Sequence, residues 1–245
     1  MKQILKRIFH HEELTREEAC TLMQRMTGGE MNEAQTAALL AAFQMRGVKV
    51  DELVGFRDAL LQACVPVDLH EFHPVDIVGT GGAGKYTFYI STCACCVVAV
   101  MERYGVKFTN DADKLKRSIE QCGMAYLHAP LFHPALKTVA PVRKALGVRT
   151  LFNLLGPLVN PCHPACQLLG VADLPQMRLY TNTLQQLGIQ FAVVNNLDGY
   201  DEISLTDEFK VMTNRYETIY RQSEFGFSMA RQEERSGGTN PEAAA

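Results

Sequence analysis

The chain has 245 residues, of which 47% are hydrophobic and 21% are charged, and its formal net charge is -3. This composition is ordinary for a globular protein with a sizeable core, and the charge argues against a general nucleic-acid-binding protein, which usually carries a basic surface. The longest apolar run ends at Glu102 and Arg103, too short to span a membrane, and the N-terminus lacks the apolar segment of a signal peptide. We therefore expect a cytoplasmic protein that binds neither nucleic acid nor a membrane.

The N-terminal residues 1–65 predict a small domain of short helices. Thr15 with Glu18, and Asn32 with Gln35, have the spacing of side chains that satisfy free N–H groups at a helix start. One of the helices has an apolar face that could serve either the internal core or a contact with a second copy of the chain. That face is formed by Leu39, Leu40 and Phe43.

From residue 66 to residue 227, short apolar runs alternate with amphipathic segments, which predicts an α/β domain with a mainly parallel sheet flanked by helices. Residues 134–160 are expected to pack back on the helical domain, and residues 228–245 form a polar tail. The predicted strands are 75–78, 124–127, 167–171 and 191–195, with a hairpin or edge pair at 210–213 and 218–221. The predicted helices are 91–104, 113–121, 134–146 and 175–187.

A glycine cluster follows the first predicted strand, and a Ser91-Thr92 pair then opens a small-residue helix. Glycines leave the backbone bare, so a phosphate can approach the N–H groups near a helix N-terminus. A dinucleotide fingerprint is a poor match because residues 85–90 separate the glycines from the helix. A P-loop is also a poor match, because Tyr86 stands where that motif needs a serine or threonine hydroxyl for magnesium.

The whole run from Gly79 to Thr92 resembles the phosphoribosyl-diphosphate loop of the anthranilate phosphoribosyltransferase family, Gly-Thr-Gly-Gly-Asp-Gly followed by Thr-Phe-Asn-Ile-Ser-Thr. Further family landmarks occur in order, including Phe-Asn-x-x-Gly-Pro-Leu-x-Asn-Pro at residues 152–161, so the resemblance covers nearly the whole chain. The other matching segments are residues 132–135, 142–147 and 199–204.

The resemblance implies an enzyme that joins the anthranilate amine to C1 of phosphoribosyl diphosphate and expels pyrophosphate, with Mg²⁺ as cofactor and no covalent nucleophile. It also implies a homodimer. By the resemblance, the residues expected to bind the diphosphate are Gly79, Thr80, Gly81, Gly82, Thr87, Ile90, Ser91 and Thr92. Those expected to bind anthranilate are Gly79, His133 and Arg143, and those expected to bind magnesium are Ser91, Asp201 and Glu202.

Two asparagines in the matching run have a different expected role. Asn153 and Asn160 are expected to fix loop backbone rather than to touch substrate, because asparagine side chains bond readily to nearby main chain.

The chain also departs from the family pattern. Ala83 replaces the loop aspartate, Tyr89 replaces an asparagine and Tyr86 adds a second large ring. The Lys-His-Gly-Asn loop of the family is absent from the sequence, together with a strand, which points to an internal deletion. We therefore expect weak or no catalysis. Two other functions stay open: a non-catalytic scaffold or binding protein that keeps the fold, and a pyrimidine nucleoside phosphorylase-like enzyme.

Overall fold

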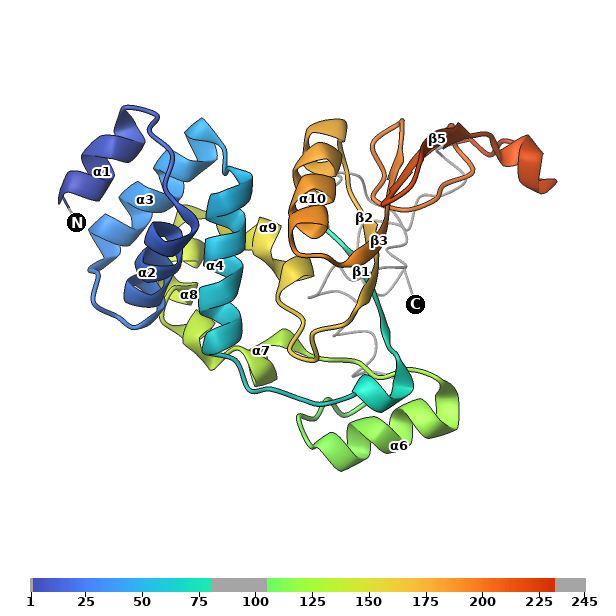
Figure 1. Cartoon of the computed structure of the whole chain (residues 1–245), viewed down its shortest axis with the longest axis horizontal. Coiled ribbons are helices and arrows are strands. Elements are labelled where there is room, and N and C mark those ends of the chain that lie inside the picture. The colour runs from blue at the N-terminus through green and yellow to red at the C-terminus, as the bar shows by residue number, and fades with distance from the viewer. Residues whose placement is uncertain (1, 81–104, 232–245) are drawn as a thin grey trace. The chain divides into compact units, whose positions relative to one another are not determined.

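The structure is a computed structural model and describes residues 2–80 and 105–231 (Figure 1). The chain divides into two compact units, Met1–His73 with Phe108–His163, and Pro74–Lys107 with Pro164–Ala245. The first unit is thus larger than the helical domain of residues 1–65 expected from the sequence. Its second segment contains residues 134–160, which were expected to pack back on the helical domain. Within that range, the helices Ala140–Leu146 and Leu151–Leu155 contact the helix Glu33–Arg46.

Four helices form the N-terminal part of the first unit, and the two predicted helix starts are confirmed. The Glu18 N–H donates to Thr15 Oγ1 (3.2 Å), and the Thr15 N–H donates to the Glu18 carboxylate (3.0 Å). Asn32 and Gln35 form the same reciprocal pair, at 2.9 and 3.2 Å. The helices are α1 (Lys2–Phe9), α2 (Arg16–Thr27), α3 (Glu33–Arg46) and α4 (Val50–Gln62).

The apolar face of α3 belongs to the internal core of this unit. Leu39 and Leu40 are fully buried and Phe43 is 1% exposed within the single chain. The Phe43 ring meets Phe56 of α4 edge to face, with 5.2 Å between centroids. Of the two roles that the sequence left open for this face, the structure shows the internal core. A face that is buried within one chain cannot contact a second copy.

Shorter helices make up the rest of the first unit. The helix predicted at 113–121 is confirmed as α6, whereas the predicted helix at 134–146 is interrupted. A 3-10 turn (Pro134–Lys137) precedes α8, which has Pro141 in its first turn. Proline lacks an N–H and therefore starts a helix more readily than it continues one. The helices are α6 (Ala112–Cys122), α7 (Ala129–Phe132), α8 (Ala140–Leu146) and α9 (Leu151–Leu155).

The strand predicted at 124–127 is wrong, because these residues form no ladder in the structure. Ala125 and Leu127 instead pack against a small core cluster around Leu115 and Phe132. The Met124 carbonyl accepts a hydrogen bond from the Ser118 hydroxyl (2.8 Å). An apolar run that covers a core without a neighbouring strand has the same sequence pattern as a buried strand.

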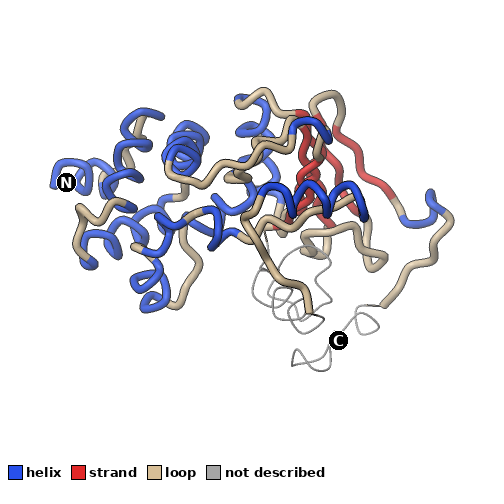
Figure 2. Tube along the Cα trace, turned by 90° about the horizontal axis from the view of Figure 1, so that it is seen from below, coloured by secondary structure: helices blue, strands red, loops and turns tan. Residues whose placement is uncertain are grey.

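The second unit contains a five-stranded sheet in the order β1-β2-β3-β4-β5 (Figure 2). The first three strands are parallel, and β4 and β5 add as an antiparallel hairpin, so the predicted parallel sheet and edge pair are both present. Helix α10 (Leu174–Gln186) packs on β3, and Leu169 and Val193 are fully buried. The strands are β1 (Val75–Gly79), β2 (Cys166–Gly170), β3 (Gln190–Asn196), β4 (Phe209–Thr213) and β5 (Glu217–Tyr220).

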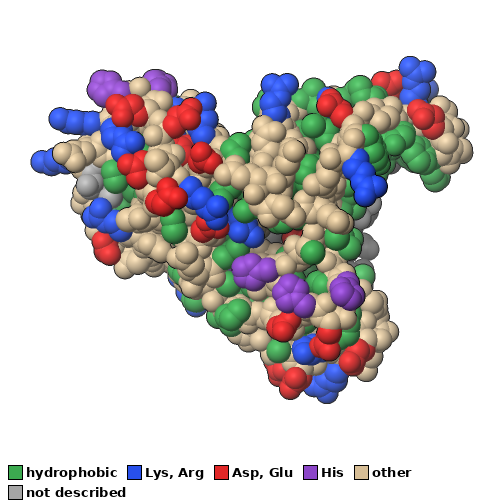
Figure 3. Space-filling model, in the orientation of Figure 1, with side chains coloured by type: hydrophobic (Ala, Val, Ile, Leu, Met, Phe, Trp, Pro, Cys, Tyr) green, Lys and Arg blue, Asp and Glu red, His purple; other side chains and the backbone are tan. Residues whose placement is uncertain are grey.

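Charges are mixed on the surface of the first unit. Figure 3 shows acidic and basic side chains interspersed over its helices on the visible face, with neither sign forming a continuous area there. No helix in the described ranges is both long enough and apolar enough to cross a lipid bilayer. The helix predicted at 91–104 and the end of the polar tail, 232–245, lie outside the described residues.

Candidate active site

The carboxyl ends of the parallel strands bring several predicted site residues together. Gly79 at the end of β1 pairs in register with Gly170 at the end of β2, and the Thr80 N–H donates to the Gly170 carbonyl (2.9 Å). In an open α/β sheet, ligands bind outside this edge of the strands. The glycine loop therefore starts at the edge of the sheet where a binding site is expected.

Gly170 also lies in close contact with the loop that follows β3. A Cβ atom built on Gly170 would lie 1.7 Å from the carbonyl oxygen of Asp201, so only glycine permits this contact. The Asp201 backbone therefore lies against β2, one strand away from Gly79. Sequence reasoning missed Gly170, although a glycine at the carboxyl end of a predicted strand is a signal for close backbone approach.

Asp201 and Glu202, called the acidic pair below, are only partly accessible. Asp201 is 4% exposed, and Glu202 is half-buried. Their carboxylate oxygens are hard ligands of the kind that Mg²⁺ prefers. Gly170 holds the Asp201 backbone beside the start of the glycine loop, and the two carboxylates are of the donor type that fits the ion. The described residues contain no group of three or more His, Cys, Asp or Glu suited to a metal, and the third predicted ligand, Ser91, lies outside them.

Thr80 is the one further diphosphate residue that the structure describes. Its hydroxyl oxygen is buried and has no hydrogen-bond partner within the described ranges. Burying a hydroxyl without a partner is costly, so such an atom beside a glycine loop is suited to a ligand oxygen. The other predicted diphosphate residues lie outside the described residues, as do the departures from the family pattern: Gly81, Gly82, Thr87, Ile90, Ser91 and Thr92, with Ala83, Tyr86 and Tyr89.

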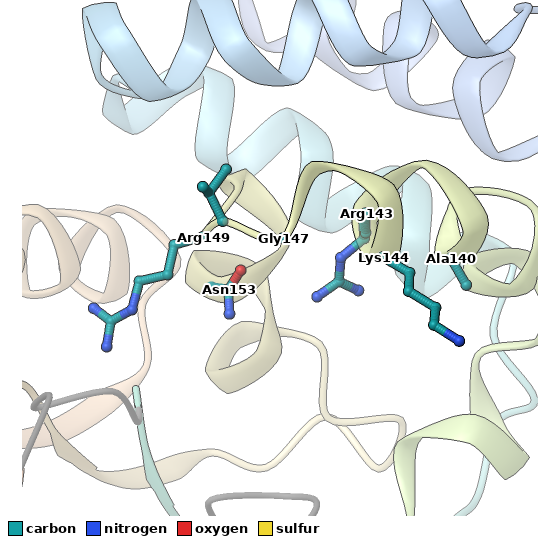
Figure 4. Close-up of a pocket in the computed structure, with 7 residues that line it drawn as sticks. Ala140, Arg143, Lys144, Gly147, Arg149 and Asn153 are labelled. Carbon is teal, nitrogen blue, oxygen red and sulfur yellow. The ribbon is translucent and has the colours of Figure 1, made fainter.

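Arg143 lines an open pocket in the first unit, about 460 Å³ in volume. Figure 4 shows the Arg143 side chain of α8 and Asn153 of α9 reaching into the same space, with Lys144 and Arg149 on either side. All the charged side chains that line the pocket are positive, which suits an anionic ligand. The lining residues are Ala140, Arg143, Lys144, Gly147, Val148, Arg149 and Asn153.

The guanidinium of Arg143 lies 5.1 Å from the centre of the Phe152 ring, an arrangement that favours a cation over the ring face. Burial lowers the pKa of Arg143, but an arginine remains charged at neutral pH. Sequence reasoning did not single out Lys144 and Arg149, although their basic side chains flank the same glycine turn at Gly147.

His133 takes a different position from Arg143. It is 3% exposed, and its Nε2–H donates to the Val159 carbonyl (2.8 Å). Burial lowers the pKa of His133, against the opposing effect of the Val159 and Leu60 carbonyls. A neutral imidazole held by main chain supports the connection between helices, and His133 is not among the residues that line the Arg143 pocket.

The expected backbone roles of the two asparagines are confirmed. Asn153 Oδ1 accepts from the Thr150 N–H (3.0 Å) at the start of α9, and Asn160 Oδ1 accepts from the Cys162 N–H (3.0 Å). Asn153 in addition lines the basic pocket.

Comparison with known proteins gives family matches over both parts of the chain. Residues 2–64 match the helical bundle domain of the glycosyl transferase family, and residues 99–245 match its a/b domain. An anthranilate phosphoribosyltransferase of Phocaeicola vulgatus is 65% identical, over all of this chain and 80% of the relative. That alignment is 266 positions long, so at least 21 positions of the relative face gaps in this 245-residue chain. This supports the internal deletion expected from the sequence.

Solved structures give the same result. A crystal structure of anthranilate phosphoribosyltransferase from Thermus thermophilus is similar with a TM-score of 0.85 and 33% identity, over 98% of this chain and 79% of that one. The Saccharomyces cerevisiae enzyme in complex with PRPP and Mg shares the fold, with a TM-score of 0.83 and 22% identity over 98% of this chain and 77% of that one. The relatives favour the transferase over the scaffold and phosphorylase alternatives.

Proposed function

The chain belongs to the anthranilate phosphoribosyltransferase family, and on that premise we propose how its own residues serve the transfer of a phosphoribosyl group from phosphoribosyl diphosphate to anthranilate. The diphosphate binds at the carboxyl end of β1–β3, between the glycine loop and the acidic pair. The observation that carries the proposal is the contact of Gly170 with the Asp201 backbone, beside Gly79.

In this proposal the diphosphate oxygens meet bare backbone at Gly79, Gly81 and Gly82 and the hydroxyls of Thr80 and Ser91. Thr87, Ile90 and Thr92 complete this part of the site. Mg²⁺, held by Ser91 and the acidic pair, would neutralise negative charge on the leaving diphosphate. A relative was solved in complex with PRPP and Mg, which supports this choice of ligand and ion.

Anthranilate is proposed to bind with its carboxylate at Arg143, where Lys144 and Arg149 add positive charge. A guanidinium can offer a carboxylate two parallel hydrogen bonds, which fixes orientation as well as charge. The family resemblance also assigns Gly79 and His133 to the anthranilate site. His133 would act there indirectly, by holding the backbone at Val159. A yeast relative was solved with 4-fluoroanthranilate, which supports the substrate class.

We further propose that transfer is slow in this chain. Ala83 removes an acidic side chain from the loop, and the family's Lys-His-Gly-Asn loop is absent from the sequence. The reaction requires the protein to hold the diphosphate, to supply magnesium and to position the acceptor. The resemblance implies that the missing loop helps with the first and the last of these. Turnover equal to that of the Thermus thermophilus relative would overturn this part. Restoring the acid with Ala83→Asp should raise kcat/KM.

Calorimetric titration with phosphoribosyl diphosphate, with and without Mg²⁺, tests the site itself. We expect binding heat that depends on Mg²⁺ and is lost in Asp201→Asn and in Glu202→Gln. Glu217→Gln on β5 is the matched control, because it removes one negative charge from the same unit at a residue outside the proposed site. Absence of Mg²⁺-dependent heat from the parent chain would favour a non-catalytic scaffold.

A homodimer in the cytoplasm is part of the same proposal. The contact would use residues other than Leu39, Leu40 and Phe43, which are buried within one chain. Phe9 at the end of α1 and Met45 near the end of α3 are exposed large apolar residues on two helices that contact each other. Sedimentation of the parent and of Met45→Glu tests the dimer, and cell fractionation tests the location.

A further inference from the structure

The loop that carries the acidic pair leaves β3 at Asn196 and is closed by the backbone of that residue. The Asn196 N–H donates to the Tyr200 carbonyl (3.0 Å), and the Asn196 carbonyl accepts from the Gly199 N–H (2.8 Å). Asn196 itself is completely buried. The turn immediately before the acidic pair is therefore built on the last residue of a central strand.

The Asn196 side chain forms hydrogen bonds with residues on both sides of the acidic pair. Its Oδ1 accepts from the Ser204 N–H (3.3 Å), after the acidic pair, and its Nδ2 donates to the Asp198 carboxylate, before it. A buried amide with both ends bonded is a rigid connection, because losing either bond leaves an unsatisfied polar atom. One side chain thus joins the two ends of the loop.

Two hydroxyl groups complete the connection. Thr206 Oγ1 donates to the second oxygen of the Asp198 carboxylate, and it lies 2.6 Å from Ser204 Oγ. The Thr206 N–H donates to Ser204 Oγ (3.2 Å). Asn196, Asp198, Ser204 and Thr206 therefore form one polar cluster, called the Asn196 cluster below.

We infer that Asn196 is a positioning residue for the acidic pair, acting with Thr206 through the Asn196 cluster. The inference rests on the proposed function, because it takes Asp201 and Glu202 as ligands of a divalent cation. The Gly170 contact fixes this loop against the sheet at Asp201, and the cluster fixes both of its ends. Residues that orient metal ligands in this way commonly change metal affinity by about 10–100-fold when they are replaced.

The test measures Mn²⁺ binding in the presence of phosphoribosyl diphosphate, by the electron paramagnetic resonance signal of free Mn²⁺, together with the Tm of each variant. We expect Asn196→Ala and Thr206→Val to raise the Kd for Mn²⁺ by about tenfold or more. Thr206→Ser keeps the hydroxyl and should retain the parent Kd. If Asn196→Ala fails to fold, the Thr206 pair of variants carries the test.

Asn214→Ala is the matched control for a purely structural asparagine. Asn214 accepts from the Phe191 N–H (2.8 Å) and donates to the Ile189 carbonyl (3.0 Å) in the same unit, outside the loop. It should lower the Tm and leave the Mn²⁺ affinity unchanged. The inference is overturned if folded Asn196→Ala and Thr206→Val bind Mn²⁺ as the parent does, or if Asn214→Ala loses the same affinity. A parent chain that binds no Mn²⁺ overturns the proposed function, and the inference with it.

Discussion

Arg46 and Glu52 form a buried ion pair between the end of α3 and the start of α4. Arg46 Nη2 lies 2.6 Å from both Glu52 carboxylate oxygens, and the two side chains are 4% and 0% exposed. Glu52 also accepts from the N–H groups of Leu14 and Lys49, at 2.9 Å each. The carboxylate thereby ties the segment before α2 and the start of α4 to the end of α3.

Glu52→Gln should destabilise the protein by about 3–5 kcal/mol, because it leaves the buried Arg46 charge without its partner. Urea denaturation measures this loss. Glu13→Gln breaks the exposed pair of Glu13 with Lys49 and should change the unfolding free energy by less than about 1 kcal/mol. Equal losses in the two variants would show that burial of the pair is unimportant.

Gly170→Ala should abolish Mg²⁺-dependent binding of phosphoribosyl diphosphate and destabilise the fold by about 1–3 kcal/mol. The new Cβ would meet the Asp201 backbone, which must move and take the acidic pair with it. Calorimetry and a thermal melt measure the two effects.

Two other glycines serve as controls for that experiment. Gly55→Ala should also destabilise the fold, because the new Cβ would lie 2.2 Å from the Arg16 carbonyl oxygen. Since Gly55 lies between helices of the first unit, this variant should leave binding intact. Gly156 has helical backbone and directly precedes Pro157, so the Cβ in Gly156→Ala would crowd the proline ring and should lower stability while leaving binding intact. Intact binding in Gly170→Ala would contradict the role of the contact.

Arg143→Gln should weaken anthranilate binding about 10–100-fold, the range expected for losing a charge-assisted hydrogen bond. Anthranilate is titrated by calorimetry in the presence of phosphoribosyl diphosphate. Arg178→Gln removes the same charge from an exposed position on α10 and should have no effect. If Arg143→Gln binds anthranilate like the parent, the carboxylate lies elsewhere.

His133 should make stability depend on pH. Burial lowers its folded-state pKa below the ordinary value of 6.5, so below that pH the unfolded chain takes up a proton that the folded chain does not. Stability should therefore fall as the pH is lowered from about 6.5 towards the folded-state pKa. The unfolding free energy of His133→Gln should decline less than that of the parent, whereas exposed His10→Gln should follow the parent. Identical pH profiles for the parent and His133→Gln would contradict this.

Local signals in the amino-acid order were enough to place several elements. The capping pairs at Thr15 and Asn32 place two helix starts, because each is settled by residues three positions apart. Strands β1 and β2 were found from short apolar runs, and the family was identified from ordered motifs. The local pattern failed at residues 124–127, where the same apolar run covers a core without entering a sheet.

The individual contacts between distant residues could be seen only in the folded chain. Nothing in the residues around Gly170 identifies the Asp201 carbonyl as its neighbour, and nothing around Asn196 predicts its bond to Ser204, because both contacts depend on how the loop folds back over the sheet. The apolar face of α3 likewise became core only because other elements pack against this helix, among them α1, α8, α9 and Phe56 of α4. Motifs carry residue types and spacing, whereas the approach of two backbones depends on packing far along the chain.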